Sequence, residues 1–219
     1  MTTLTLYFAT NRNHRGGDRW HPTGYGTKFS DDGAENLRFG RLTVEAEPPK
    51  LAAALAAACA GGVGDGEELS EYLAKRAKQA DIQAYEEVLN PAEDPAKAKL
   101  GSKAMFRDLK SVMEKSTDVV IYIHGFNVSW HDAVGSALAL QCMLNQKVTP
   151  DLEQPTQVVL FSWPSDVMEI TWASYNSDRT DAAAESGARS GGEGDQFDFV
   201  QVGARLDRQG DGAFVVGLH

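Results

Sequence analysis

An apolar run that stops at a histidine–glycine pair constrains the fold of this chain more than any other feature. Residues 119–123 are Val-Val-Ile-Tyr-Ile, and His124 and Gly125 follow directly. A β-branched, aromatic run of this length is typical of a parallel strand that is buried on both faces. A helical pattern begins at about Trp130. The sequence therefore predicts a buried strand, a tight loop and a helix, in that order.

A second apolar run, residues 157–162, follows this helix, which is predicted from about His131 to Leu144. Ser129 with Asp132 three residues later is a typical helix start. Two strands joined by a helical crossover form a right-handed parallel unit in nearly all folds. We therefore expect an α/β fold. Trp163-Pro164-Ser165 should lie beside His124, because the carboxyl ends of parallel strands share one edge of the sheet.

The remaining patterns divide the chain into three expected parts. Residues 1–102 are predicted as an N-terminal extension, 103–184 as the core, beginning with a helix over 103–115, and 185–219 as an irregular tail. Eight of the 21 glycines lie in residues 187–219, where only 197–202 and 213–216 are strand-sized apolar runs. The extension is expected to hold two strands, at Leu4–Ala9 (an edge or outer strand) and Arg38–Ala46, and two helices, at Lys50–Cys59 and Glu67–Leu89.

Composition excludes several kinds of partner and site. The formal net charge of -10 opposes phosphate backbones and anionic lipids, so we expect no nucleic-acid and no membrane partner. The apolar run over 51–60 is too short to span a bilayer, and the first residues lack the basic region of a signal peptide. Cys59 and Cys142 suit free thiols, which favours a cytoplasmic location. The histidines show no metal-ligand spacing, so neither a metal nor a cofactor is predicted.

The loop after residue 123 is the candidate site. Glycine lets backbone N–H groups approach an anionic oxygen, so the amides of Gly125 and Phe126 are oxyanion-hole candidates. The alternative is a plain strand-exit turn in which His124 bonds a neighbouring loop. We do not expect His124 to be a general base, because no serine or cysteine is visibly paired with it. Asn127 is expected to hold the loop through bonds from its side chain to the backbone.

The segment after the second strand supplies loop and pocket candidates. Trp163 is predicted to line a pocket or to pack the loop. Ser165 and Ser162 flank the Trp-Pro pair, and neither is expected to be a nucleophile, because a strained nucleophile elbow requires small neighbours.

Four motifs carry a resemblance to a known family. They are Asn11-Arg-Asn13, Tyr122-Ile-His-Gly-Phe-Asn-Val-Ser129, Leu160-Phe-Ser-Trp-Pro-Ser165 and Tyr175-Asn-Ser-Asp-Arg179. Together they resemble a bacterial α/β-hydrolase family of undetermined function that is usually described as esterase- or lipase-like. The resemblance spans about residues 4–184. It implies a partial α/β-hydrolase-like sheet with flanking helices and an N-terminal extension, serine-hydrolase chemistry and a small acyl-ester-like ligand.

The chain departs from that family in its second half. The family carries its nucleophile on a histidine-serine-methionine-glycine elbow after the Ser-Asp-Arg segment, and neither this motif nor Gly-x-Ser-x-Gly occurs here. The acid and the C-terminal histidine are also absent. We expect the chain to be a truncated or frameshifted product of a full-length hydrolase gene, because an incomplete sheet exposes an edge that natural folds cover. Such a product should have little esterase activity. A genuine short homologue is the other explanation.

Two further functional interpretations stay open. One is a non-catalytic binding or interaction module on the same scaffold, with Trp130, Trp163 and Trp172 as contact residues. The other is a strand–helix–strand scaffold without a ligand. The exposed sheet edge could also support self-association.

Overall fold

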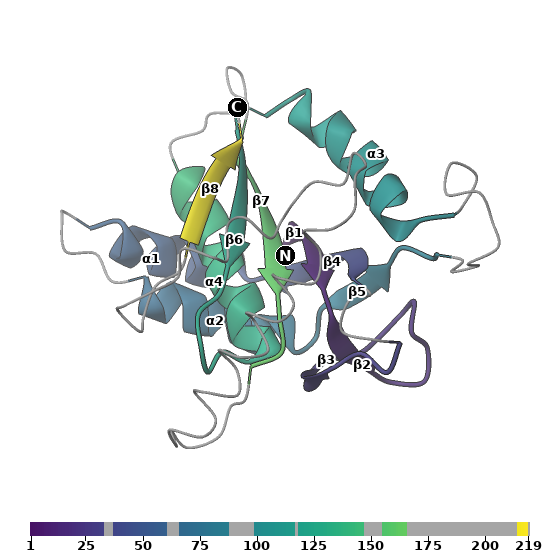
Figure 1. Ribbon diagram of the computed structural model, residues 1–219. Helices are drawn as coiled ribbons and strands as arrows, with labels where there is room; N and C mark the ends of the chain where they lie inside the picture. The colour runs from purple at the N-terminus through teal and green to yellow at the C-terminus, as the bar shows by residue number, and fades with distance from the viewer. Residues whose placement is uncertain are drawn as a thin grey trace.

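The chain folds around one six-stranded mixed sheet flanked by helices (Figure 1). The computed structural model describes residues 1–32, 37–60, 66–87, 99–116, 118–146 and 155–165, and the backbone of 214–218. The sheet order is β5-β4-β1-β7-β6-β8, and β2 and β3 form a separate two-stranded ribbon. The strands are β1 (Thr2–Thr10), β2 (Arg12–Arg15), β3 (Gly24–Phe29), β4 (Arg38–Ala46), β5 (Asp81–Ala84), β6 (Val119–Ile123), β7 (Gln157–Ser162) and β8 (Phe214–Leu218). The helices are α1 (Pro48–Ala58), α2 (Glu67–Ala77), α3 (Gly101–Met113) and α4 (Trp130–Leu144).

Three parallel strands form the middle of the sheet. β7 lies between β1 and β6 and is parallel to both, with Tyr7 and Ile121 on either side of Val159. β4, β5 and β8 are added antiparallel to their neighbours. The parallel β6–α4–β7 unit and the α/β class predicted from the sequence are both confirmed.

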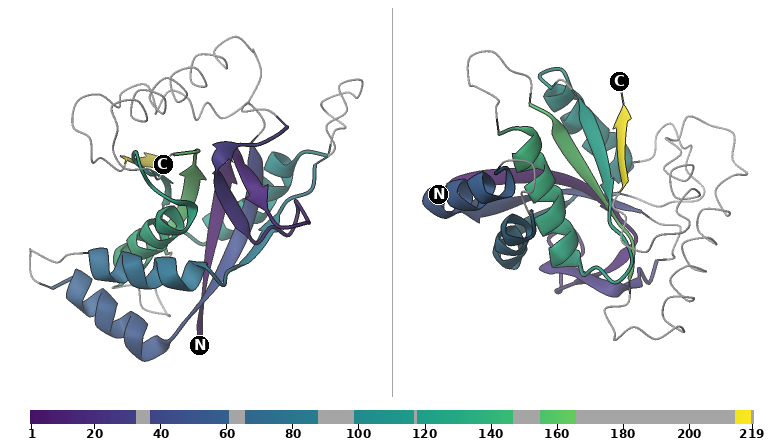
Figure 2. Two further views of the ribbon diagram at one scale, coloured as in Figure 1. Left: turned by 90° about the horizontal axis from the view of Figure 1, so that it is seen from below. Right: turned by 90° about the vertical axis from the view of Figure 1, so that its left-hand side faces the viewer.

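Helices cover both faces of the sheet, because its central strands alternate between two apolar surfaces. Leu6 and Phe8 of β1 belong to the core that α1, α2 and α4 share with the sheet. Tyr7 points the other way and packs with Met105 and Leu109 of α3. The views in Figure 2 show these two helical layers on opposite sides of the strands.

Two predictions for the first 102 residues are wrong. β1 was expected at the edge of the sheet, yet it pairs with β4 on one side and β7 on the other. The helix expected over Glu67–Leu89 ends at Ala77, and residues 81–84 pair with β4 as strand β5. In both cases pairing with distant strands outweighs the local pattern. Between the two strands expected in this part of the chain, residues 12–29 contain the β2–β3 ribbon.

The sheet extends across the expected boundary at residue 102. β1, β4 and β5 precede this position, whereas β6, β7 and β8 follow it. The first 102 residues therefore supply strands to the same sheet as the expected core. Within the expected tail, residues 214–218 form β8, which pairs antiparallel with β6, and the other tail residues lie outside the described part. Cys59 and Cys142 are free thiols.

Candidate functional site

The predicted site residues gather where three parallel strands end. In the register of β1 and β7, Thr10 lies opposite Ser162, and in that of β6 and β7, Ile123 lies opposite Phe161. Arg12, His124 and Trp163 follow these positions by one or two residues. Carboxyl ends of parallel strands are where α/β folds place their sites, so this shared edge is the candidate site.

Residues 124–129 form the loop between β6 and α4, which is called the corner below. The helix that follows this loop has a capped N-terminus. Gly125 and Phe126 are half-buried, and Asn127 is exposed with a φ of 58°. Asparagine tolerates this left-handed region better than most residues. The side chain of Ser129 accepts a hydrogen bond of 3.2 Å from the backbone N–H of Asp132, which confirms the predicted cap. Bonds from the Asn127 side chain to the backbone remain a prediction.

Trp163 and Ser165 hold this corner from the end of β7. The indole Nε1 of Trp163 donates to the carbonyl of His124 at 3.1 Å. The two rings stack with centroids 5.4 Å apart and an interplanar angle of 9°. The buried hydroxyl of Ser165 accepts from the backbone N–H of Val128 at 3.1 Å. Of the two roles expected for Trp163, the structure shows loop packing.

Arg12 is a buried residue of the candidate site that was not predicted from the sequence. It is 1 % exposed. Its guanidinium donates to Ser162 Oγ (2.9 Å), to the carbonyls of Gly26 (2.9 Å) and Val128 (2.9 Å), and to His124 Nε2 (3.2 Å). One side chain thus connects β7, the β2–β3 ribbon, β6 and the segment before α4. The only signal in the sequence was the position of Arg12 inside the Asn11-Arg-Asn13 motif.

The structure places a serine beside His124, although no serine is visibly paired with it in the sequence. Ser162 Oγ lies 3.0 Å from His124 Nε2. Burial, and then the nearby Arg12 cation, lower the pKa of His124 from 6.5 to about 3, so the ring is neutral at pH 7. Its Nδ1 lies 2.8 Å from the Gly125 carbonyl. A carbonyl only accepts, so Nδ1 carries the hydrogen and Nε2 is the acceptor.

The Ser162–His124 pair is not arranged for nucleophilic catalysis. A general base must take up a proton, and the Arg12 cation beside Nε2 opposes this. The hydroxyl oxygen of Ser162 is fully buried and accepts a bond from Arg12 Nε. A substrate carbonyl therefore has no access to this oxygen in the structure.

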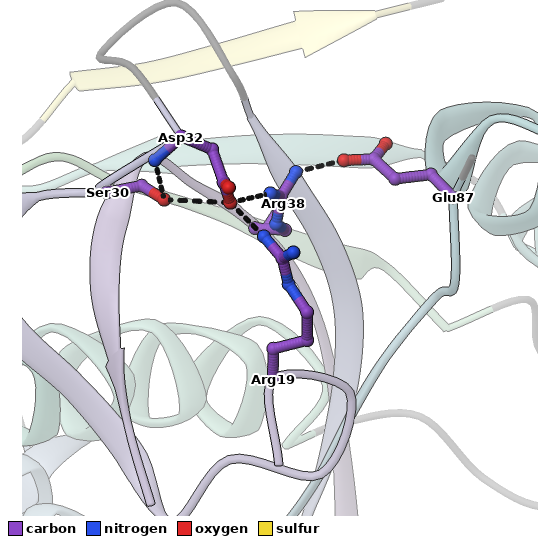
Figure 3. Close-up of polar contacts among 5 residues, drawn as sticks. All are labelled: Arg19, Ser30, Asp32, Arg38 and Glu87. Carbon is purple, nitrogen blue, oxygen red and sulfur yellow. Dashed lines mark hydrogen bonds and ion pairs between the residues drawn. The ribbon is translucent and has the colours of Figure 1, made fainter. Parts of the chain in front are cut away.

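A hollow of about 510 Å³ lies elsewhere, beside the β2–β3 ribbon. It is lined by His14, Gly17, Asp18, Arg19, Trp20, Ser30, Asp31 and Asp32, none of which was predicted as a site residue. Figure 3 shows the ionic network at this place, in which Asp32 binds Arg19 and Arg38, and Arg38 also binds Glu87. Both guanidinium groups also lie against the ring of Trp20. The network braces the ribbon and the start of β4 against the segment that follows β5.

Among the residues that the structure describes, no group of three His, Cys, Asp or Glu side chains is arranged to hold a metal ion. Over the same residues, no helix is long and apolar enough to cross a bilayer.

Trp130 cannot be a contact residue of a binding module, which corrects one part of that interpretation. It is 2 % exposed. Its ring packs edge-on against Phe8 and Tyr25, with centroids 5.2 and 4.6 Å away. Trp172, the third expected contact residue, lies outside the described part.

Residues 101–188 match a protein family described as an alpha/beta hydrolase of unknown function. This match includes α3, β6, α4 and β7, and thus the corner and the Trp163 segment, whereas Arg12 lies before it. The chain matches no curated protein and no solved structure. Similarity to an α/β hydrolase of unknown function agrees with the observed fold.

Proposed function

We propose that the edge formed by β1, β7 and β6 is the oxyanion side of an esterase-type α/β-hydrolase domain. The backbone N–H groups of Gly125 and Phe126 would receive the carbonyl oxygen of a small acyl ester as negative charge develops on it. One such donor contributes about 3 kcal/mol to stabilisation of the transition state.

The orientation of one peptide group carries this proposal. The Gly125 carbonyl points at Nδ1 of the buried His124 ring. The described chain has no cis peptide bond, and in a planar trans peptide the N–H points opposite to the C=O. The N–H of Phe126 is therefore directed away from the buried ring. An oxyanion hole needs a donor with a defined direction at a strand end, and the orientation of this peptide is the observation that supports the proposal.

The first test is hydrolysis of p-nitrophenyl acetate by the purified 219-residue chain. We expect little or no turnover, because the sequence has no Gly-x-Ser-x-Gly elbow and Ser162 is enclosed by Arg12 and His124. Robust hydrolysis that a serine-directed phosphonate abolishes would contradict this expectation.

The second test addresses the oxyanion corner without requiring turnover. Titration of the ¹⁵N-labelled chain with methylphosphonate, a tetrahedral anion, should shift the amide signals of Gly125 and Phe126 in a saturable way. Phe126→Pro removes the backbone donor, whereas Phe126→Leu is the matched control that keeps it. We expect saturable binding with leucine and none with proline. If neither amide responds in the unaltered chain, or if the proline variant binds equally well, the corner is not an anion site.

A further inference from the structure

Arg12 holds both ends of the candidate corner with a single nitrogen. Its Nη2 donates to His124 Nε2 at 3.2 Å and to the Val128 carbonyl at 2.9 Å. His124 precedes the Gly125–Phe126 peptide and Val128 follows it by two residues. The planar guanidinium is itself fixed from two further sides, by Ser162 Oγ on Nε and by the Gly26 carbonyl on Nη1. The distance across the corner therefore depends on a rigid, buried side chain.

The same contact determines which nitrogen of His124 carries the hydrogen. Arg12 can only donate, so a bond from Nη2 requires a lone pair on Nε2. The hydrogen of the neutral ring is then on Nδ1, where it donates to the Gly125 carbonyl at 2.8 Å. The opposite tautomer would place Nε2–H against a guanidinium N–H and leave Nδ1 facing a carbonyl oxygen. Arg12 and the Gly125 carbonyl therefore require the same tautomer, and Arg12 is the side chain that enforces it from the Nε2 side.

We propose that Arg12 is a positioning residue that acts through His124 to orient the Gly125–Phe126 peptide. Arg12 donates to Nε2, the opposite nitrogen Nδ1 donates to the Gly125 carbonyl, and the planar peptide directs the Phe126 N–H the other way. The functional importance of this relay rests on the proposed oxyanion role of the corner. The relay itself is a property of the folded chain and can be tested alone.

A hydrogen bond with Ser162 is the competing explanation for the tautomer of His124. Its hydroxyl lies 3.0 Å from the same Nε2 and can donate to it. It can also accept, so it is compatible with either tautomer. Arg12 imposes one tautomer and Ser162 does not. In the absence of the Ser162 hydroxyl, the Gly26 and Val128 carbonyls still hold the Arg12 guanidinium. Substitution of Ser162 should therefore leave the tautomer of His124 unchanged, whereas substitution of Arg12 should not.

The experiment is ¹⁵N NMR of the His124 ring nitrogens, recorded together with the Phe126 amide signal. In the unaltered chain we expect a protonated Nδ1 and an unprotonated Nε2 from pH 8 to pH 5. Arg12→Lys keeps the charge but loses the fork, so it should mix the two tautomers and displace the Phe126 amide signal. Ser162→Ala, the matched control, should preserve both signals. A protonated Nε2 in the unaltered chain, unchanged spectra in Arg12→Lys, or a tautomer released by Ser162→Ala would each overturn the proposal.

If Arg12→Lys does not fold, a second pair of variants tests the contact between residue 124 and the Gly125 carbonyl. An asparagine amide nitrogen can take the place of Nδ1, whereas a glutamine amide nitrogen takes that of Nε2. His124→Asn should therefore keep the Phe126 amide signal at its position in the unaltered chain, whereas His124→Gln should displace it. Equal signals in the two variants would refute the relay. Methylphosphonate binding is scored separately: its absence beside an intact relay counts against the proposed function alone.

Discussion

The packing of α2 on α4 leads to a prediction that runs against helix propensity. Gly135 lies within α4, and a β-carbon built there would be 2.5 Å from the Ser70 carbonyl oxygen and 2.7 Å from the backbone nitrogen of Ala74. Ordinary contact begins at about 3.4 Å. Two of the three nearest atoms are backbone atoms and cannot rotate away. α2 would have to retreat by about 0.9 Å, the difference between these distances.

The expected cost follows from two opposing terms. Alanine in place of glycine within a helix gains about 1 kcal/mol, whereas overpacking a close contact costs about 1–3 kcal/mol. Because the obstruction is backbone, we take the upper end and expect Gly135→Ala to lower the free energy of unfolding by about 2 kcal/mol. The retreat would also stretch the 2.9 Å hydrogen bond between the hydroxyls of Ser70 and Ser136.

Urea unfolding followed by circular dichroism measures this cost. The midpoint should fall by about 1 M with an unchanged slope, given a slope of about 1–3 kcal/mol/M for a small protein. Gly17→Ala is the matched control, because no atom lies within 4 Å of its β-carbon position, and its midpoint should barely change. If Gly135→Ala is as stable as the unaltered chain, α2 is free to shift and the reasoning from close packing is wrong.

Two further predictions concern stability. The unfolded chain takes up a proton at His124 near pH 6.5, whereas the folded residue stays neutral down to about pH 3, so stability from this group falls with decreasing pH by up to about 1.4 kcal/mol per unit. Unfolding from pH 7 to pH 5.5 should show this loss in the unaltered chain and not in His124→Asn; equal pH dependence would rule out a buried neutral ring. Asn145 binds both the N–H and the C=O of Thr156, at 2.8 and 2.9 Å. Asn145→Ala should cost about 1–3 kcal/mol and speed amide exchange at residue 156, and unchanged exchange would argue against this clamp.

The candidate corner could be predicted because its signals are local. The apolar run of β6, the cap at Ser129 and the second run at β7 each identify an element within a few residues. Parallel pairing of β6 with β7 then brings Trp163 beside His124, as expected. The oxyanion role of Gly125 and Phe126 remains a prediction, because it concerns a ligand and not the fold.

The burial of Arg12, in contrast, could not be predicted from local sequence signals. An arginine after a short strand is compatible with a solvent-exposed loop, which is the commoner fate of arginine. Its burial depends on acceptors far away in sequence, on Ser162, His124 and two carbonyl groups. None of these partners can be recognised before the strands have been arranged in space.

The sequence by itself determined the buried strands β6 and β7, the capped helix between them and the edge on which the corner lies, because periodicity and capping act between near neighbours. Only the tertiary structure decided that β1 is central, that residues 81–84 form a strand, and that Arg12 is buried against His124. Strand order and burial of a charge depend on hydrogen bonds between distant segments, and such bonds leave no periodic pattern in the chain.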